Sequence, residues 1–198
     1  AIRRQRQMCI RDRNKVTQYL FRRQIIGLFE MYAFLFVAFL ILPFIFSLIS
    51  GSLSDYSLAE QMRGTWITAA FGVYMFAIST LSYENFKFLI QNGISRTTFF
   101  EAQVTVYGLL ILIGNTFNLF YQYVVLMPLV HAHNTNIFMS SYVNYFHNPF
   151  VGFIFNFIFS GLLLVVGTLI GMVIGNFLTL FSKIVQRIIL IVTPIIAY

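Results

Sequence analysis

Residues 33–46 read Ala-Phe-Leu-Phe-Val-Ala-Phe-Leu-Ile-Leu-Pro-Phe-Ile-Phe, within a longer stretch, residues 31–49, that contains no charged side chain. A helix of about 20 apolar residues is long enough to cross the roughly 30 Å hydrocarbon core of a bilayer. The stretch therefore predicts a transmembrane helix. Pro43 is the expected position of a kink, because proline cannot donate a helical hydrogen bond.

The rest of the chain has the same character. Hydrophobic residues make up 59% of the 198 residues and charged residues only 10%, whereas a soluble domain carries about 25% charged residues. Further apolar stretches cover residues 66–82, 104–130 and 150–174, and another begins at residue 188 and reaches residue 198. We therefore predict an all-α, polytopic transmembrane helix bundle. It has four complete spans and an incomplete fifth, all in one domain over residues 14–198.

The N-terminal stretch is treated separately. Residues 5–13, Gln-Arg-Gln-Met-Cys-Ile-Arg-Asp-Arg, resemble translated sequencing-adaptor sequence, so we set residues 1–13 aside as non-native. They contain the single cysteine, Cys9, so no disulfide is expected within the chain. Their five arginines and one aspartate also supply four of the seven net positive charges. The basic balance therefore does not indicate a nucleic-acid partner.

The basic residues that remain lie almost entirely on one side of the predicted spans. Alternate loops face opposite sides, and one side carries Lys15, Arg22, Arg23, Lys87, Arg96, Lys183 and Arg187, whereas the other carries only Arg63. Because cytoplasmic loops are enriched in Lys and Arg, this bias predicts a cytoplasmic N-terminus. Residues 14–29 mix basic and apolar side chains, which favours an interfacial helix over a charged start to the first span.

Residues 83–101, between the second and third predicted spans, carry the most local information. Three apolar side chains fall at helical spacing: Phe86, Leu89 and Ile90. Asn92-Gly93 is a natural helix stop, after which Ile94 is placed to contact Leu89. The next helix is capped either by Ser95 or by a capping box of Thr98 and Glu101. We predict a short amphipathic helix, a sharp turn and a new helix leading into the third span.

This segment resembles the coupling region of type-2 ATP-binding-cassette (ABC) exporter permeases. The matching positions are Glu84 ahead of the short helix and, after it, Gly93, Ser95 and Arg96. The order of elements also matches, over about residues 14–198. The resemblance implies six spans in the whole protein, a bacterial plasma-membrane location, a second permease copy and a separate ATPase subunit into which the short helix docks.

In such a contact, we expect Phe86, Leu89 and Ile90 to fill an apolar cleft on the ATPase. Glu84, Lys87 and Arg96 would then make polar contacts at its rim. The chain contains no G-x-x-x-x-G-K-[ST] phosphate-binding loop. It is therefore not expected to be an enzyme or to bind a cofactor, and ATP would be hydrolysed on the partner.

Two other function classes fit an apolar polytopic chain. One is an ion-coupled secondary transporter, which usually carries intramembrane charges; no Asp, Lys or Arg occupies the centre of a complete predicted span here. The other is a non-transport membrane protein, such as an immunity or sensor component. Binding of an ATPase subunit separates the exporter from both.

Polar and small residues inside the spans give further candidates. Asn115, Asn118 and Gln122 share one face of the third span, where they either line a transport path or form interhelical hydrogen bonds. Gly167, Gly171 and Gly175 form a stripe on the fourth span, which predicts close packing against another helix of the same chain rather than of a second copy. No metal site is expected, because His131, His133 and His147 lack Cys or carboxylate companions.

Overall fold

The computed structural model describes residues 2–51, 57, 66–130, 137–142, 145, 148–179 and 181. Every regular element in these ranges is helical, as predicted. In chain order they are α1 (Ile2–Phe36), η1 (Val37–Ile41), α2 (Leu42–Ile49), α4 (Trp66–Thr80), α5 (Tyr83–Gln91), α6 (Arg96–Phe120), η3 (Tyr121–Leu126), α7 (Met127–Val130), α8 (Ile137–Tyr142) and α9 (Pro149–Leu178), where η1 and η3 are π-helical.

Three continuous helices are long and apolar enough to cross a membrane. They cover Arg13–Ile49, Arg96–Leu126 and Pro149–Leu178 and coincide with the first, third and fourth predicted spans. The second predicted span, 66–82, coincides with α4, which has 15 residues and is therefore about 22 Å long at 1.5 Å per residue. The fifth, 188–198, lies outside the described residues, so the number of spans stays a prediction.

The first long helix corrects one expectation. Helix α1 runs through residues 14–29 to Phe36 without a break, so this segment is the charged start of the first long helix and not a separate interfacial helix. The reason is a buried stripe of side chains four residues apart that holds the helix straight against its neighbours: Val16, Leu20, Gln24 and Leu28. Residues 2–13 belong to the same helix.

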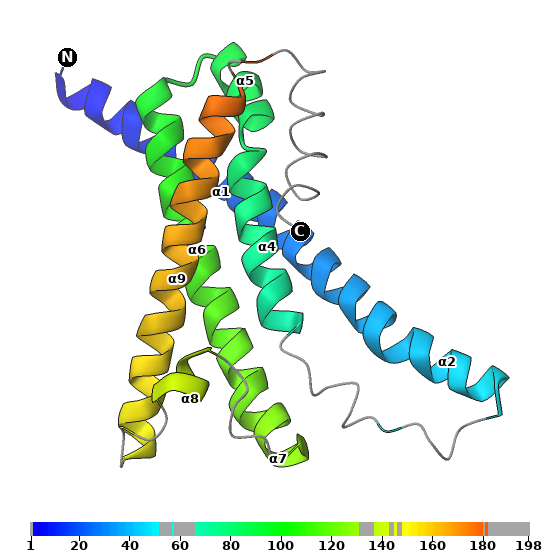
Figure 1. Cartoon of the computed structure of the whole chain (residues 1–198). Coiled ribbons are helices and arrows are strands. Elements are labelled where there is room, and N and C mark those ends of the chain that lie inside the picture. The colour runs from blue at the N-terminus through cyan, green and yellow to red at the C-terminus, as the bar shows by residue number, and fades with distance from the viewer. Residues whose placement is uncertain are drawn as a thin grey trace.

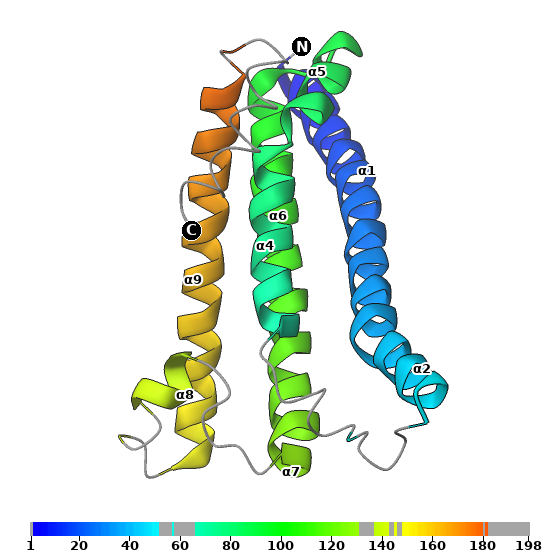
Figure 2. The same cartoon turned by 45° about the vertical axis from the view of Figure 1, so that its right-hand side comes forward.

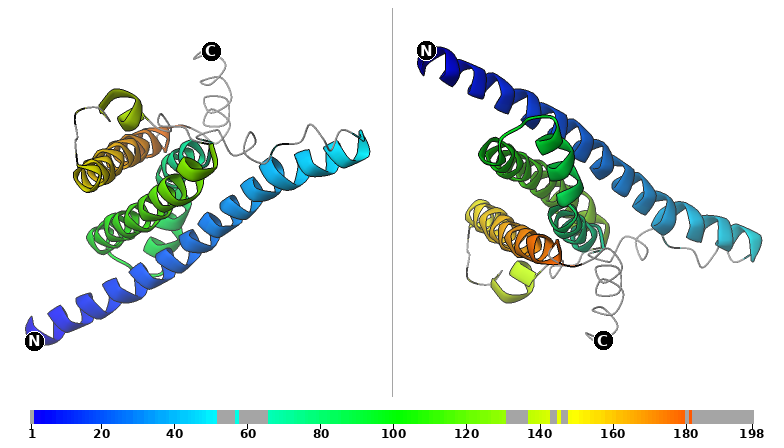
Figure 3. Two further views of the ribbon diagram at one scale, coloured as in Figure 1. Left: turned by 90° about the horizontal axis from the view of Figure 1, so that it is seen from below. Right: turned by 90° about the horizontal axis from the view of Figure 1, so that it is seen from above.

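Helix α6 is the centre of the bundle. Figures 1 and 2 show α4, α6 and α9 side by side, and Figure 3 shows α1 running along one side of the group. Helix α1 packs on α6, and α4 packs on α9. The main hydrophobic core is accordingly built from α1, α4, α5 and α6: Val16, Leu20, Leu28, Phe71, Met75, Leu89, Phe99, Ala102, Val106, Tyr107, Leu110 and Ile111.

Both π-helical segments end just before a proline. The last residue of η1 is Ile41, two residues before Pro43, and the last residue of η3 is Leu126, two residues before Pro128. A proline ring clashes with the carbonyl group four residues earlier, and these carbonyls belong to Phe39 and Val124, inside the π-helical turns. The kink expected at Pro43 thus takes the form of a locally widened helix that accommodates the ring.

The two ends of the bundle differ. One end holds α5, the start of α6 and the end of α9, and the other holds α2, α7 and α8 (Figures 1 and 2). Helix α2 extends away from the other helices (Figure 3). Its large apolar side chains are exposed, with Phe46 at 67% and Ile49 at 74%. Exposure of these side chains to water would raise the free energy of the protein. Contact with lipid hydrocarbon or with another apolar surface would avoid that increase.

Candidate functional site

Helix α5 ends in a turn that satisfies its last carbonyl groups. The amide of Ile94 donates to the carbonyl oxygen of Leu89 (3.1 Å), and the amide of Gly93 donates to that of Ile90 (3.0 Å). Gly93 has φ = 82°, a left-handed conformation that disfavours side chains with a Cβ atom. This is the two-bond Schellman arrangement at a helix end. The helix stop predicted at Asn92-Gly93 is therefore present.

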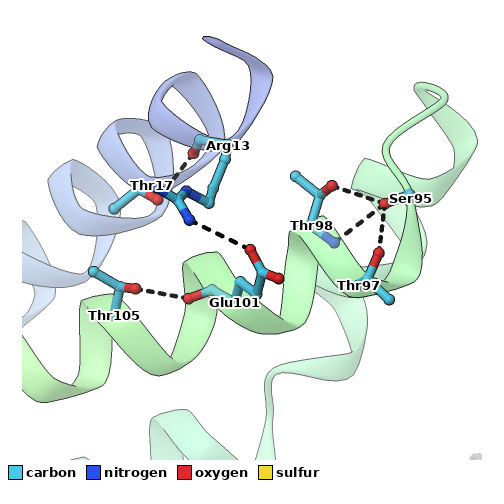
Figure 4. A network of polar contacts seen from close by, with 7 residues as sticks. All are labelled: Arg13, Thr17, Ser95, Thr97, Thr98, Glu101 and Thr105. Atoms are coloured by element: carbon cyan, nitrogen blue, oxygen red, sulfur yellow. Dashed lines mark hydrogen bonds and ion pairs between the residues drawn. The ribbon is translucent and has the colours of Figure 1, made fainter. Parts of the chain in front are cut away.

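Ser95 starts the next helix. Its hydroxyl oxygen accepts a hydrogen bond from the amide of Thr98 (3.1 Å) and contacts the hydroxyls of Thr97 and Thr98 (Figure 4). The alternative capping box does not form, because the Glu101 carboxylate points toward α1 and pairs with Arg13 (3.5 Å). Together the two caps fix the angle between α5 and α6.

The apolar side of α5 faces the chain's own core, which occupies two of the three apolar residues expected to contact a partner. Leu89 is buried, with 7% of its surface exposed, and Phe86 packs edge-on against Phe99 with ring centroids 5.3 Å apart. Ile90 is half-buried. An amphipathic helix that lies across the ends of its neighbours lowers its free energy by covering them. Phe86 and Leu89 are therefore not free to fill a cleft on a partner.

The opposite side of α5 is the exposed one. Its residues share one helical face and all are solvent-exposed: Glu84, Lys87, Phe88 and Gln91. We call these four residues the outer face of α5. Two of them, Glu84 and Lys87, belong to the predicted coupling residues, whereas Phe88 and Gln91 were missed. The hydrophobic spacing locates the buried stripe but does not say which molecule buries it.

Helix α5 is also attached to α1. The Arg23 guanidinium donates a hydrogen bond to the side-chain oxygen of Asn85, and the rings of Tyr19 and Phe88 stack with centroids 6.2 Å apart. Neither pairing has a local sequence signal, since the partners are more than 60 residues apart. With Phe86 held by α6, a displacement of α5 would be carried to both α1 and α6.

The predicted polar residues of the third span are buried, with Asn115 and Asn118 on α6 and Gln122 on η3. The Asn115 side chain donates to the carbonyl oxygen of Phe157 (2.9 Å) and accepts from the Ser160 hydroxyl (2.7 Å), both on α9. On the other side, the Tyr32 hydroxyl of α1 donates to the Asn118 side-chain oxygen (3.1 Å). Gln122 is buried as well. For Asn115 and Asn118, the geometry is that of interhelical hydrogen bonding.

The glycine stripe of α9 makes close contact at two of its three positions. A Cβ atom on Gly171 would lie 2.9 Å from the carbonyl oxygen of Phe76, and one on Gly175 would lie 2.5 Å from that of Thr80, both on α4. The Thr80 hydroxyl also donates to the carbonyl oxygen of Gly171 (3.3 Å). A Cβ on Gly167 would meet no atom within 4 Å in the described structure.

Helices α4 and α6 also approach each other closely at Gly114, which is not among the predicted site residues. A Cβ atom on Gly114 would overlap the ring of Phe71, which is fully buried between α4 and α6. The signal that could have found it is a glycine next to Asn115 inside an apolar helix. Small residues at such positions allow two membrane helices to approach closely.

Within the described ranges, no three residues of the His, Cys, Asp and Glu types are placed to hold a metal ion. His131, His133 and His147 lie outside those ranges. No family model, curated protein or solved structure matches the chain. The functional assignment therefore depends on the geometry of the bundle and of α5.

Proposed function

We propose that the chain is the membrane-spanning subunit of an ABC-type exporter in a bacterial plasma membrane, with α5 as its contact with a separate ATPase subunit. One observation carries the proposal. Helix α5 is a short helix fixed by caps at its end, joined to α1 and α6, and exposed along its outer face. A rigid lever of this kind transmits a push from a soluble partner to membrane helices.

The charge distribution supports the orientation. The basic residues that the structure describes, among them Arg22, Arg23, Lys87 and Arg96, lie at the end of the bundle that holds α5. The described residues of α2, α7 and α8 contain no Lys or Arg. Basic residues favour the cytoplasmic side, where ATP and an ATPase subunit are found. The N-terminus would then be cytoplasmic as well.

The apolar surface supports a membrane location and further partners. Helices α2 and α9 expose large apolar side chains along most of their length, including Ile49 (74%), Phe150 (69%) and Val173 (68%). Membrane lipid, the remaining spans and a second permease copy would cover this surface. The substrate path would lie between the two copies, because Asn115 and Asn118 are already used in hydrogen bonds between helices of one chain.

Co-purification with an ATPase subunit tests the proposal. The chain would be co-expressed with an ABC-type ATPase subunit from the same organism, solubilised in detergent and recovered through a tag. We expect the ATPase to be retained by the unaltered protein and lost with Lys87→Glu and with Phe88→Asp, since both change the outer face of α5. Lys15→Glu is the matched control, because it reverses an exposed charge on α1 without touching α5.

Leu89→Asp is unsuitable as the test, since Leu89 belongs to the core and its replacement would unfold the site. Thermal unfolding of each variant must therefore match that of the unaltered protein. If the ATPase stays bound to both outer-face variants, α5 is not the contact. If no ATPase binds the unaltered chain, the exporter assignment fails.

A further inference from the structure

A cavity of about 320 Å³ lies at the α5 end of the bundle, and none of the described residues that line it belongs to α1. Its wall is built from the turn before α5, from α5 itself, from the first turns of α6 and from the last turns of α9. Among its residues are Ser82, Phe86, Arg96, Phe99, Met172 and Asn176. The volume lies at the lower limit of small-molecule sites, roughly 300–1,000 Å³.

The lining favours an anion. Among the described residues that line it, Arg96 is the only charged one, and none is an aspartate or a glutamate. The ion pair found in the described residues joins Arg13 to Glu101 on the α1 side and does not involve Arg96. The Asn176 amide adds neutral donor groups, whereas the Ser82 side chain is hydrogen-bonded to Tyr107. A guanidinium with a free fork of donors, next to neutral donors, suits a phosphate group.

The other part of the lining is apolar. Phe99 is buried at the back of the cavity, and Met172 contributes a flexible apolar side chain from α9. Phe100, which also lines the cavity, is 57% exposed at its rim. A free phosphate ion would gain nothing from these surfaces. A molecule with an anionic head and hydrocarbon chains would use both parts.

The depth of the cavity matches that of a lipid headgroup. Helix α6 begins at Arg96 and α9 ends at Leu178, and both belong to long apolar helices able to cross a membrane. The cavity therefore lies where the apolar helices reach the bilayer surface. Headgroup phosphates occupy this level, and the leaflet on the basic side of a plasma membrane carries anionic lipid.

We propose that this cavity binds the headgroup of an anionic phospholipid, with its phosphate at Arg96 and its hydrocarbon chains passing Phe100 into the bilayer. The bound lipid would bridge α6 and α9 beside α5, and would thereby hold the α5 end of the bundle together. The inference requires a membrane location, which is part of the proposed function, but it does not require an ATPase partner.

Lipid titration of the purified protein in a neutral detergent tests this site. Phosphatidylglycerol or phosphatidylcholine would be added, with bound lipid counted by native mass spectrometry and the unfolding midpoint followed by thermal shift. We expect phosphatidylglycerol to bind and to raise the midpoint, and phosphatidylcholine to do neither. Arg96→Gln should weaken phosphatidylglycerol binding roughly tenfold, as expected for a lost charged hydrogen bond.

Two variants make the result specific. Lys15→Gln removes one exposed charge on α1 outside the cavity and should bind phosphatidylglycerol as the unaltered protein does. Met172→Trp keeps the charge but fills the cavity, and should weaken binding. Arg96→Gln is expected to fold, because Arg96 is exposed and a positive charge at the start of a helix is unfavourable.

Three outcomes would overturn the inference. Equal weakening by Arg96→Gln and Lys15→Gln would indicate general attraction to a basic surface. Unchanged binding by both Arg96→Gln and Met172→Trp would place the lipid elsewhere. A rise in the midpoint with soluble glycerol phosphate equal to that with lipid would make this a site for a water-soluble anion. No ATPase is present in the assay, so a failure here is separate from a failure of the exporter assignment.

Discussion

Gly175 of α9 lies directly against the backbone of Thr80 of α4, so closely that a Cβ atom at position 175 would be 2.5 Å from the Thr80 carbonyl oxygen. One turn earlier, Gly171 lies against Phe76 and accepts a hydrogen bond from the Thr80 hydroxyl. This contact holds the 15-residue helix α4 against the much longer α9. It joins two elements that are not consecutive in the chain.

The glycine contact can be tested with alanine. Gly175→Ala should destabilise the protein by about 1–3 kcal/mol, the usual cost of forcing extra volume into a packed interface. Gly167→Ala is the control on the same helix, since its Cβ would enter open space. It should be neutral or slightly stabilising, because alanine is the better helix former. Equal thermal unfolding midpoints for the two variants in detergent would show that α4 and α9 do not pack in this way.

Asn115 gives a second prediction. Asn115→Leu removes both hydrogen bonds to α9 and should lower stability by about 1–2 kcal/mol, as for interhelical hydrogen bonds in membranes. Thr116→Val is the matched control, because the Thr116 hydroxyl is exposed and bonds only to the Leu112 carbonyl of its own helix. Chemical unfolding followed by circular dichroism would compare the two. A larger loss for Thr116→Val would contradict the placement of Asn115 against α9.

The turn after α5 gives a third prediction. Gly93→Ala should cost roughly 1–2 kcal/mol, because a left-handed conformation strains a residue with a Cβ atom, and Gly93→Asn should cost less. Gly108→Ala is the control. An added Cβ atom would have no neighbour within 4 Å at either glycine. Gly108, however, lies inside α6 and has the helical backbone that alanine adopts without strain. Thermal unfolding of the three variants would separate backbone strain from crowding, and a fully stable Gly93→Ala would refute the Schellman turn.

The orientation of the chain in the membrane gives a fourth prediction. In a Cys9→Ser background, cysteines introduced at Lys87 and at Tyr145 should react differently with a membrane-impermeant maleimide added to intact cells. Both positions are exposed. Lys87 lies on α5, whereas Tyr145 contacts Tyr142 of α8, at the opposite end of the bundle. We expect Tyr145→Cys to react at once and Lys87→Cys only after permeabilisation. The reverse pattern would place the N-terminus and α5 outside the cell.

The sequence was most informative where short-range physics decides the result. The long apolar helices follow from hydropathy alone, and the start of α6 at Ser95-Arg96 follows from a capping side chain within four residues. The segment 14–29 is not a separate helix but continues into the first long helix. Its mixed composition suits both an interfacial helix and the start of a long one. Only the buried stripe from Val16 to Leu28, which packs within the bundle, distinguishes these alternatives. The position of the segment at the membrane interface stays a prediction.

Helix α5 shows where sequence reasoning stops. The spacing of Phe86, Leu89 and Ile90 is the same whether their side chains face a partner or the chain's own core. The spacing of three glycines on α9 likewise does not reveal that Gly171 and Gly175 touch α4 whereas Gly167 does not.

By itself, the sequence determined the helical, membrane-type character of the chain and the position where α5 ends, and it left two alternative starts for α6, because hydropathy and capping depend on residues a few positions apart. The tertiary structure alone decided which face of α5 is exposed, which glycines are in contact and which amides are paired. These features depend on how distant helices pack together, and packing energies arise between residues that no local pattern connects.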